Sequence, residues 1–374
     1  MLTTIAATLL ALSIPPAPDD GRATLAATGA VESVVSEGPE AWSFGGMSGI
    51  DHSGRGVYTM ICDDRAKIDP ARAARASITI DDGAIAVGPV EWIELLDDSG
   101  RAFGRNEVDA ESVRTLPPEI RERHGVRGWV WSSEGRIKDG VPPAIFIRRG
   151  SGRVDRVEIP EAYRHDTSDA DAQTRGVRHN RGFEAIGVHG QTLVAAPEMA
   201  LTQDERDDLT DGRQLMRIQS FGFDGRVYRP SRQVAYPFGP NPEGFDADTK
   251  NGISSILALD EDTWLVLERG EPASGGSYDI RLYRCDASGA DDISGIDALG
   301  PPDRAALPVP ARKELVLDFE TIRDALPGGR VPNFEGMSRT PTPGRVLLIA
   351  DNDHGGDGPT VLAAIDLPAW ALAE

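Results

Sequence analysis

The chain has 374 residues, and its 60 Asp and Glu outnumber 39 Lys and Arg, which gives a formal net charge of −21 at pH 7. This excess of acid argues against binding to a nucleic-acid backbone, which needs stripes of Lys and Arg, and against electrostatic attachment to anionic lipids. It favours solubility and affinity for divalent cations. The 41 Gly and 27 Pro are spread along the chain, as in proteins built from many short strands and turns.

The N-terminal segment is apolar over residues 1–14. This run is too short to span a bilayer and fits the core of a signal peptide, although it lacks a positively charged start. Small residues between Ala23 and Ala30 offer places for cleavage. We therefore expect a signal peptide and leader over residues 1–30, one domain over residues 31–374, and export to the periplasm, the cell surface or the medium.

A repeated pair of segments occupies the rest of the chain. The second residue of a short tetrad is followed, 14 to 23 residues later, by an acid that ends an apolar strand. The second residues of the tetrads are Ser48, Glu111, Glu184, Ser254 and Glu335. The acids that end the strands are Asp63, Glu134, Glu198, Glu268 and Asp351. The units begin 63 to 81 residues apart, which is longer than a solenoid repeat and typical of propeller blades of about four strands.

Each unit also carries the pattern of a blade. The strands before the acids, such as residues 263–267 and 345–350, are apolar on both faces, as expected between neighbouring blades. Residues 144–149 and 153–160 alternate apolar and polar residues around a Gly turn, as in an outer hairpin with one wet face. Inner and outer pairs together make four strands.

The predicted fold is therefore all-β: a single β-propeller of five or six four-stranded blades. Five blades are visible, and a sixth could be assembled from the two ends, with an early strand at residues 31–35 and a late one at residues 360–367. Pairing of the termini would close the ring and hide its open edges. Helices are expected only at residues 116–123 and 318–325.

The two cysteines and six histidines form no metal-type cluster, so we expect no zinc site. Cys62 and Cys285 lie in strand-like contexts and are interpreted as buried thiols, with a disulfide between distant blades left open. His179 and His189 are expected on the surface. No Gly-x-Ser-x-Gly elbow, P-loop or dinucleotide fingerprint is present.

Taken together, these motifs resemble the phytase-like family of bacterial proteins, described as "esterase-like activity of phytase". The matching segments are residues 45–51 with 63–65, 109–112 with 132–135, 181–185, 267–270, and 333–337 with 351–353. The resemblance covers nearly the whole chain beyond residue 45 and implies a β-propeller that hydrolyses ester or phosphoester bonds. Ser48 and Ser254 stand where the other tetrads carry Glu, which leaves the number of clustered carboxylates open.

Equivalent positions of successive blades converge on the central channel, so the acids should gather there. Close carboxylates are costly unless a cation neutralises them or some hold protons, and Ca²⁺ takes six to eight oxygen ligands. We predict Ca²⁺ as the cofactor. The expected ligands are Asp63, Glu111, Glu134, Glu184, Glu198, Glu268, Glu335 and Asp351.

The expected catalytic residues are Glu184, Glu335, Arg65 and Arg269. The two arginines could hold a phosphate by bidentate hydrogen bonds, or form an ion pair with a neighbouring acid of the ring. The expected partner is a small-molecule ester or phosphoester, with no nucleic acid and no membrane insertion. The oligomeric state is left open.

Three functions remain open. The first is an exported, metal-dependent phosphoester or ester hydrolase. The second is a non-catalytic binding module with structural calcium, and the third is a calcium-dependent lactonase-like hydrolase. The coordination of the metal ion would distinguish an enzyme from a binding module. An enzyme needs displaceable water on its metal, whereas a structural ion is fully ligated by protein.

Overall fold

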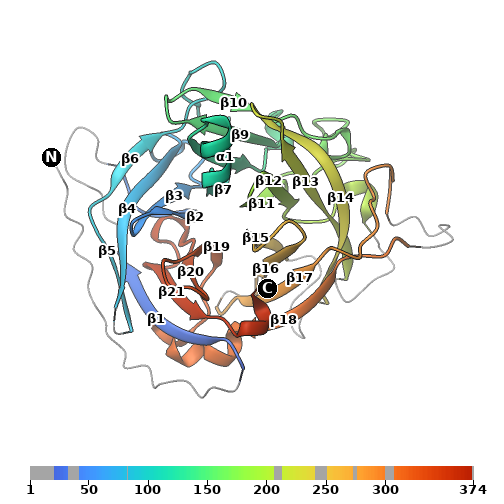
Figure 1. Cartoon of the computed structure of the whole chain (residues 1–374). Helices are drawn as coiled ribbons and strands as arrows, with labels where there is room; N and C mark the ends of the chain where they lie inside the picture. Colours follow the sequence, from blue (N-terminus) through green and yellow to red (C-terminus); the bar gives the residue numbers. More distant parts are fainter. Residues whose placement is uncertain are drawn as a thin grey trace.

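The computed structural model describes residues 21–32, 42–81, 83–205, 213–240, 251–272, 276–299 and 307–372. Antiparallel sheets are arranged as blades around a central axis (Figure 1). The first blade comprises β2 (Met47–Gly54), β3 (Val57–Cys62) and β4 (Arg72–Asp81), with β5 (Ala84–Val87) and β6 (Glu91–Glu94) each paired to part of β4. The second comprises β7 (Ala110–Thr115), β8 (Gly128–Ser133), β9 (Ala144–Arg149) and β10 (Val154–Arg156).

The remaining blades each have four strands. The third comprises β11 (Phe183–His189), β12 (Thr192–Pro197), β13 (Gln214–Phe223) and β14 (Tyr228–Phe238). The fourth comprises β15 (Gly252–Ala258), β16 (Thr263–Gly270), β17 (Asp279–Asp286) and β18 (Arg312–Asp318). The fifth comprises β19 (Phe334–Arg339), β20 (Arg345–Ala350), β21 (Thr360–Asp366) and β1 (Thr24–Val31). The predicted all-β propeller is confirmed.

The two ends of the chain meet in the fifth blade. Strand β1 pairs antiparallel with β21 along its length, so the ends complete one blade and add no sixth. One bridge from Thr28 to Ala84 also links this blade to the first. Strand β1 begins at Thr24, inside the segment predicted as a leader. Residues 33–35 of the expected early strand lie outside the described residues.

The core lies between blades. The inner strands contact one another in the order β2, β7, β11, β15, β19 and back to β2. Strand β16 is buried throughout, as its apolar pattern predicted. Trp264 packs between the third and fourth blades, and Trp131 between the first and second. Burial of each such side chain contributes about 2–3 kcal/mol to stability.

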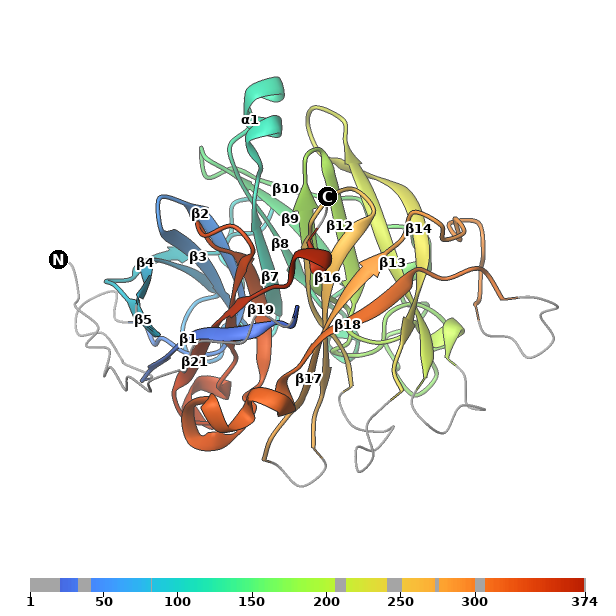
Figure 2. The ribbon, with the colours of Figure 1, turned by 60° about the horizontal axis from the view of Figure 1, so that its bottom comes forward.

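Both predicted helices are present. Helix α1 (Pro118–His124) follows β7, and the 3₁₀ helix η4 (Phe319–Ala325) precedes β19. Figure 2 shows them on opposite faces of the propeller. Asp318 caps η4 by accepting a hydrogen bond from the Glu320 amide at 3.0 Å. No helix in the described ranges is long and apolar enough to cross a membrane.

Candidate functional site

The hairpin at the centre of each blade brings the two sets of repeat residues to one end. Because the pairing is antiparallel, the start of the inner strand faces the end of the next strand. In the second blade Ala110 pairs with Ser133, which places Glu111 and Glu134 side by side. The same pairing joins Phe183 to Pro197 and Phe334 to Ala350.

A β-bulge at the start of each inner strand turns the second tetrad residue out of the sheet register. The pairing skips Ser48, Glu184, Ser254 and Glu335, and in the second blade it skips Glu111 with Ser112. A bulge leaves its extra residue unpaired and re-aims the side chain. Here it directs Glu111, Glu184 and Glu335 into a cavity at the propeller axis.

This cavity has a volume of about 550 Å³ and is lined by ten carboxylates and four arginines. Seven of the eight predicted metal ligands line it, and so do all four predicted catalytic residues. The lining acids among them are Asp63, Glu111, Glu134, Glu184, Glu198, Glu335 and Asp351, and the arginines are Arg65 and Arg269. The converging ring of acids is therefore present, except that one position holds a residue other than the predicted acid.

The substitution concerns Glu268, which the structure does not bring to the cavity. In the fourth blade Ile253 pairs with Glu268, so Arg269 takes the position that Asp63, Glu134, Glu198 and Asp351 hold in the other blades. Glu268 points to the opposite side of β16. There it accepts hydrogen bonds from Tyr236 Oη at 2.7 Å and Lys313 Nζ at 2.5 Å. The sequence alignment of this unit was out of register by one residue.

Arg269 neutralises one half of the cavity. Its guanidinium is hydrogen-bonded to Glu198 and to Glu335 and lies 4.0 Å from Glu184. Arg181 adds a hydrogen bond to Glu198 at 2.7 Å. Burial alone would raise the pKa of Glu198, but Arg269 and Arg181 hold it below its ordinary value. Of the two roles expected for Arg269, phosphate binding or an ion pair with an acid of the ring, its contacts match the ion pair.

The other half has a surplus of negative charge. The groups Asp109–Glu111–Glu134 and Glu134–Glu184–Glu198 each have ligand atoms within 4.8 Å of one another. Burial, followed by repulsion from neighbouring carboxylates, raises the pKa values of Glu111, Glu134 and Glu184 well above the ordinary range. Among the described residues, no basic side chain forms an ion pair with Glu111 or Glu134, and Glu134 Oε2 is buried without a hydrogen-bond partner.

These carboxylates fit a divalent cation. Calcium binds oxygen at 2.3–2.6 Å, so two oxygens on one ion lie at most about 5 Å apart. The 4.8 Å limit within each group satisfies this condition. Among the described residues, the orphaned Glu134 oxygen, the unpaired Glu111, and Glu184, whose one cation contact is Arg269 at 4.0 Å, supply the oxygen-rich, anionic donor set that hard cations prefer.

Arg65 and Arg181 line the same cavity as the acids. Arg65, in the left-handed region at φ 61°, donates to Asn180 Oδ1 at 3.1 Å and to Asp109 Oδ2 at 3.4 Å. Its side chain keeps 25% of its exposure, and its buried Nε has no hydrogen-bond partner among the described residues. Arg65 and Arg181 are therefore better placed than Arg269 to meet an anion.

Some cavity residues were not selected from the sequence. Asp109, Arg181 and Asn333 line or contact the cluster, and each stands two or three residues before a tetrad acid. That spacing was the available signal. Tyr278 and Arg330 come from segments outside the repeated pairs, so no repeat marked them.

Two glycines allow neighbouring blades to approach beneath the acids. A Cβ on Gly182 would lie 1.8 Å from the Glu134 carbonyl oxygen, and one on Gly252 would lie 2.1 Å from that of Glu198. The Ile253 amide donates to the same Glu198 carbonyl at 2.9 Å. Backbone contact between blades thus fixes the acid-bearing strand ends relative to one another.

Arg114 bridges the inner strands deeper in the channel. It is buried, and its guanidinium donates to Ile50 O at 2.9 Å and to Ile256 O at 2.6 Å, carbonyls of the first and fourth blades. Arg114 itself belongs to β7 of the second blade, so the side chain crosses the axis. The acidic cavity is thereby backed by a structural arginine.

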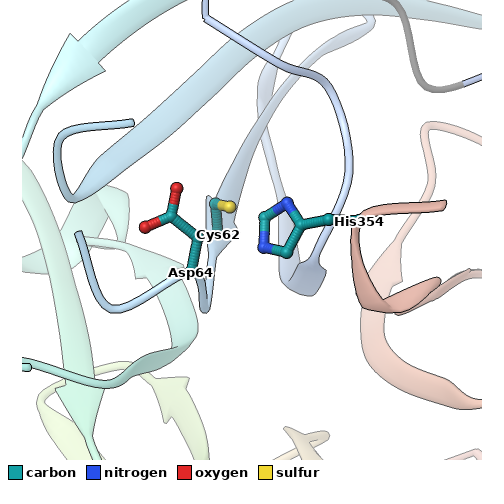
Figure 3. A group of neighbouring side chains, drawn as sticks. All are labelled: Cys62, Asp64 and His354. Carbon is teal, nitrogen blue, oxygen red and sulfur yellow. The ribbon is translucent and has the colours of Figure 1, made fainter. Parts of the chain in front are cut away.

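A second cluster, Cys62, Asp64 and His354, lies behind the first blade (Figure 3). The Asp64 carboxylate pairs with buried Arg72 and accepts amide hydrogen bonds from Lys67 and Asp69, both at 3.1 Å. Cys62 Sγ donates to Gly45 O at 3.1 Å. The Asp64 contacts hold the β3–β4 connection, and His354 Nε2 lies 3.6 Å from Asp63 Oδ1. Cys62 and Cys285 are both buried free thiols, as predicted.

Several solved structures are distantly similar to this chain. A putative glycoside hydrolase from Parabacteroides distasonis is 10% identical with a TM-score of 0.43, and the match covers 89% of this chain and 93% of that one. A structure reported with glycoside hydrolases of family 130 that target β-1,2-mannosidic linkages in Candida mannan is 13% identical, with a TM-score of 0.44 and coverage of 93% and 95%. A family 43 β-1,3-galactosidase is 10% identical, with a TM-score of 0.47 and coverage of 90% and 60%.

No curated protein matches the sequence. A family model does match, over residues 43–354, which contain the inner hairpins of all five blades and every residue of the acid cluster. Its description is "Phytase-like: Esterase-like activity of phytase". The chain belongs to this phytase-like family.

Proposed function

We propose that this protein is a metal-dependent hydrolase of ester or phosphoester bonds, with Ca²⁺ held by Glu111, Glu134 and Glu184. The observation that carries the proposal is that buried Glu111 and Glu134, which have no ion-pair partner among the described residues, share one cavity with Arg65 and Arg181. Membership of the phytase-like family supports a hydrolase-type propeller. The cation and the bond cleaved are parts of the proposal.

In this proposal the arginines of the cavity bind the substrate and the carboxylates bind the cation. Arg65 and Arg181 would bind and orient the oxyanion of the substrate, because both line the cavity and Arg65 retains free donor capacity. A divalent cation, when bound, supplies charge that attracts the oxyanion and lowers the pKa of a coordinated water. Asp63 and Asp351, which end strands in adjacent blades, would complete the acidic wall.

Glu184 and Glu335, the two carboxylates predicted to be catalytic, differ in how far neighbouring groups compensate their negative charge. Glu335 is hydrogen-bonded to Arg269 and accepts a hydrogen bond from Asn333 Nδ2 at 3.0 Å, so its charge is largely compensated. Glu184 lies farther from Arg269, at 4.0 Å, and its pKa is raised by burial and by Glu198. Glu184 is therefore the less compensated of the two, which suits it to bind the cation.

Thermal unfolding in EDTA and across a calcium titration tests the metal site. A ligand that binds only the folded state stabilises it by about 2.7 kcal/mol at a hundredfold excess over Kd. We expect a saturable rise in Tm that Glu111→Gln weakens. The matched control is Glu268→Gln, a buried acid outside the cluster, which should leave the calcium midpoint unchanged.

Assays of p-nitrophenyl phosphate, p-nitrophenyl acetate and a small lactone then separate the functions. Calcium-dependent turnover of a linear ester or phosphoester supports the proposal, and turnover restricted to the lactone would favour a lactonase-like enzyme. Calcium stabilisation without turnover of any of them would favour a binding module with a structural ion. A flat calcium response, with EDTA-treated protein verified to be metal-free, would refute the metal mechanism.

Export is proposed from the apolar segment at residues 1–14. Strand β1 begins at Thr24, so cleavage must precede this residue if the fifth blade is to keep all four strands. Mass spectrometry of the mature protein from the native host would locate the cut. A new N-terminus between Ala26 and Ala30 would contradict this boundary.

A further inference from the structure

A second, smaller cavity of about 140 Å³ adjoins the acidic one. The two share Tyr278, Arg330, Asn333 and Asp351 in their walls. Asp357 and Gly276 are shared as well. The rest of the small cavity, here called the proline pocket, is lined by Pro327, Gly328, Pro332, Ala350, Asn352, Pro359 and Val361. It lies beside the fifth blade, between the ends of β20 and β21 and the 3₁₀ turn η5 (Pro327–Gly329).

Most side chains that line the proline pocket alone, away from the wall it shares with the acidic cavity, are apolar. Proline has no backbone N–H to donate, and Ala350 and Val361 offer only aliphatic side chains. A group that enters the pocket would gain little from hydrogen bonding and much from leaving water. The pocket is also close in size to an apolar cavity of about 150 Å³ that accommodates benzene.

Charge limits what else the site can accept. The acidic cavity has six more carboxylates than arginines in its lining, and Arg269 is already committed to Glu198 and Glu335. One oxyanion can be met by Arg65 and Arg181 together with a cation. A second phosphate group on the same molecule could meet Arg330, which lines both cavities, but further ones would face carboxylates or apolar side chains, and either arrangement is costly.

We propose, on the basis of the hydrolase function above, that the substrate is an ester with one anionic group at its reacting end and a compact apolar group, about the size of a phenyl ring, at the other end. The reacting group lies in the acidic cavity, and the apolar group enters the proline pocket past Tyr278, which lines both cavities. A polyphosphorylated polyol is disfavoured as substrate. The preference resides in Val361 and the three prolines, which take no part in the acid cluster.

Binding of phosphonates tests this without requiring turnover. Methylphosphonate and phenylphosphonate carry the same head group, resist hydrolysis at the P–C bond, and resemble both a phosphate ester and a tetrahedral ester intermediate. Calorimetry in calcium, on the full mature protein, should show phenylphosphonate binding at least tenfold more tightly than methylphosphonate. Val361→Phe, which fills the pocket, should remove most of this difference while leaving the affinity for methylphosphonate within about twofold.

A second variant protects the test against misfolding of the first. Val361→Ala enlarges the pocket, so it should favour 4-methylphenylphosphonate over phenylphosphonate relative to the parent chain. Equal affinity for methyl- and phenylphosphonate in the parent, or a preference unchanged by both variants, would overturn the inference and leave the hydrolase proposal standing. Failure of both phosphonates to bind in calcium would overturn the oxyanion site and the pocket assignment with it.

Discussion

Replacing Arg269 by Met should destabilise the calcium-free protein strongly, because Arg269 is the internal counterion of the acid cluster. Its side chain is 8% exposed, and those of its partners Glu198 and Glu335 are 1% and 6% exposed. Breaking a buried ion pair by removing one partner costs about 3–5 kcal/mol, since the other charges remain buried without compensation. Met keeps the length and apolar volume of the arginine stem, so packing changes little.

This free energy converts to a measurable shift. Unfolding entropy of about 2.1 cal/mol/K per residue amounts to about 0.8 kcal/mol/K for the chain, so Tm in EDTA should fall by about 4–6 °C. The matched control is Arg345→Met. Arg345 pairs with Asp366 at 2.6 Å, but the two side chains are 23% and 44% exposed, so the loss should be at most about 1 kcal/mol.

Calcium should restore part of the stability of Arg269→Met, because two unpaired carboxylates enlarge the donor set for the ion. The measurement is differential scanning calorimetry of both variants with EDTA and with calcium. If Arg269→Met melts within about 1 °C of the parent chain in EDTA, Arg269 is not the counterion of this cluster. The division of the cavity into a neutralised and an unneutralised half would then be wrong.

Three further predictions concern the same architecture. In EDTA, the free energy of unfolding should fall as pH rises from about 4 to about 8. Burial and the charge of Asp63 raise the pKa of Asp351 to about 8, so over this range the folded state holds a proton that the unfolded state has released. Saturating calcium should abolish this dependence on pH, and urea titrations at several pH values with and without calcium would measure it. Removal of residues 1–31 should cause a large loss of stability because it strips β1 from β21, whereas removal of residues 1–23 should not, and equal unfolding midpoints for the two truncations would contradict the ring closure. Gly182→Ala should destabilise by more than about 2 kcal/mol because its Cβ would meet the Glu134 carbonyl oxygen, whereas Gly222→Ala, with open space around its Cβ, should be nearly neutral; chemical unfolding that failed to separate the two would refute the proposed contact between blades.

The repeat made the propeller and most of the site predictable from the sequence. A strand that is apolar on both faces has to be buried between neighbours, and its recurrence every 63 to 81 residues leaves a ring of blades as the simplest arrangement. Equivalent residues of such a ring lie around one axis. For this reason Glu111, Glu184 and Glu335, far apart along the chain, could be expected together.

Tertiary structure decided the register, the charge balance and the closure of the ring. The identity of the fourth-blade residue at the axis depends on which of Glu268 and Arg269 faces inward, and a shift of one residue in a strand exchanges the two faces. Whether an acid is neutralised depends on guanidinium groups that arrive from other blades, as Arg269 does at Glu198. Pairing of β1 with β21 joins residues from opposite ends of the chain. Local pattern determines which strands form, but contacts between distant segments determine which of their side chains meet.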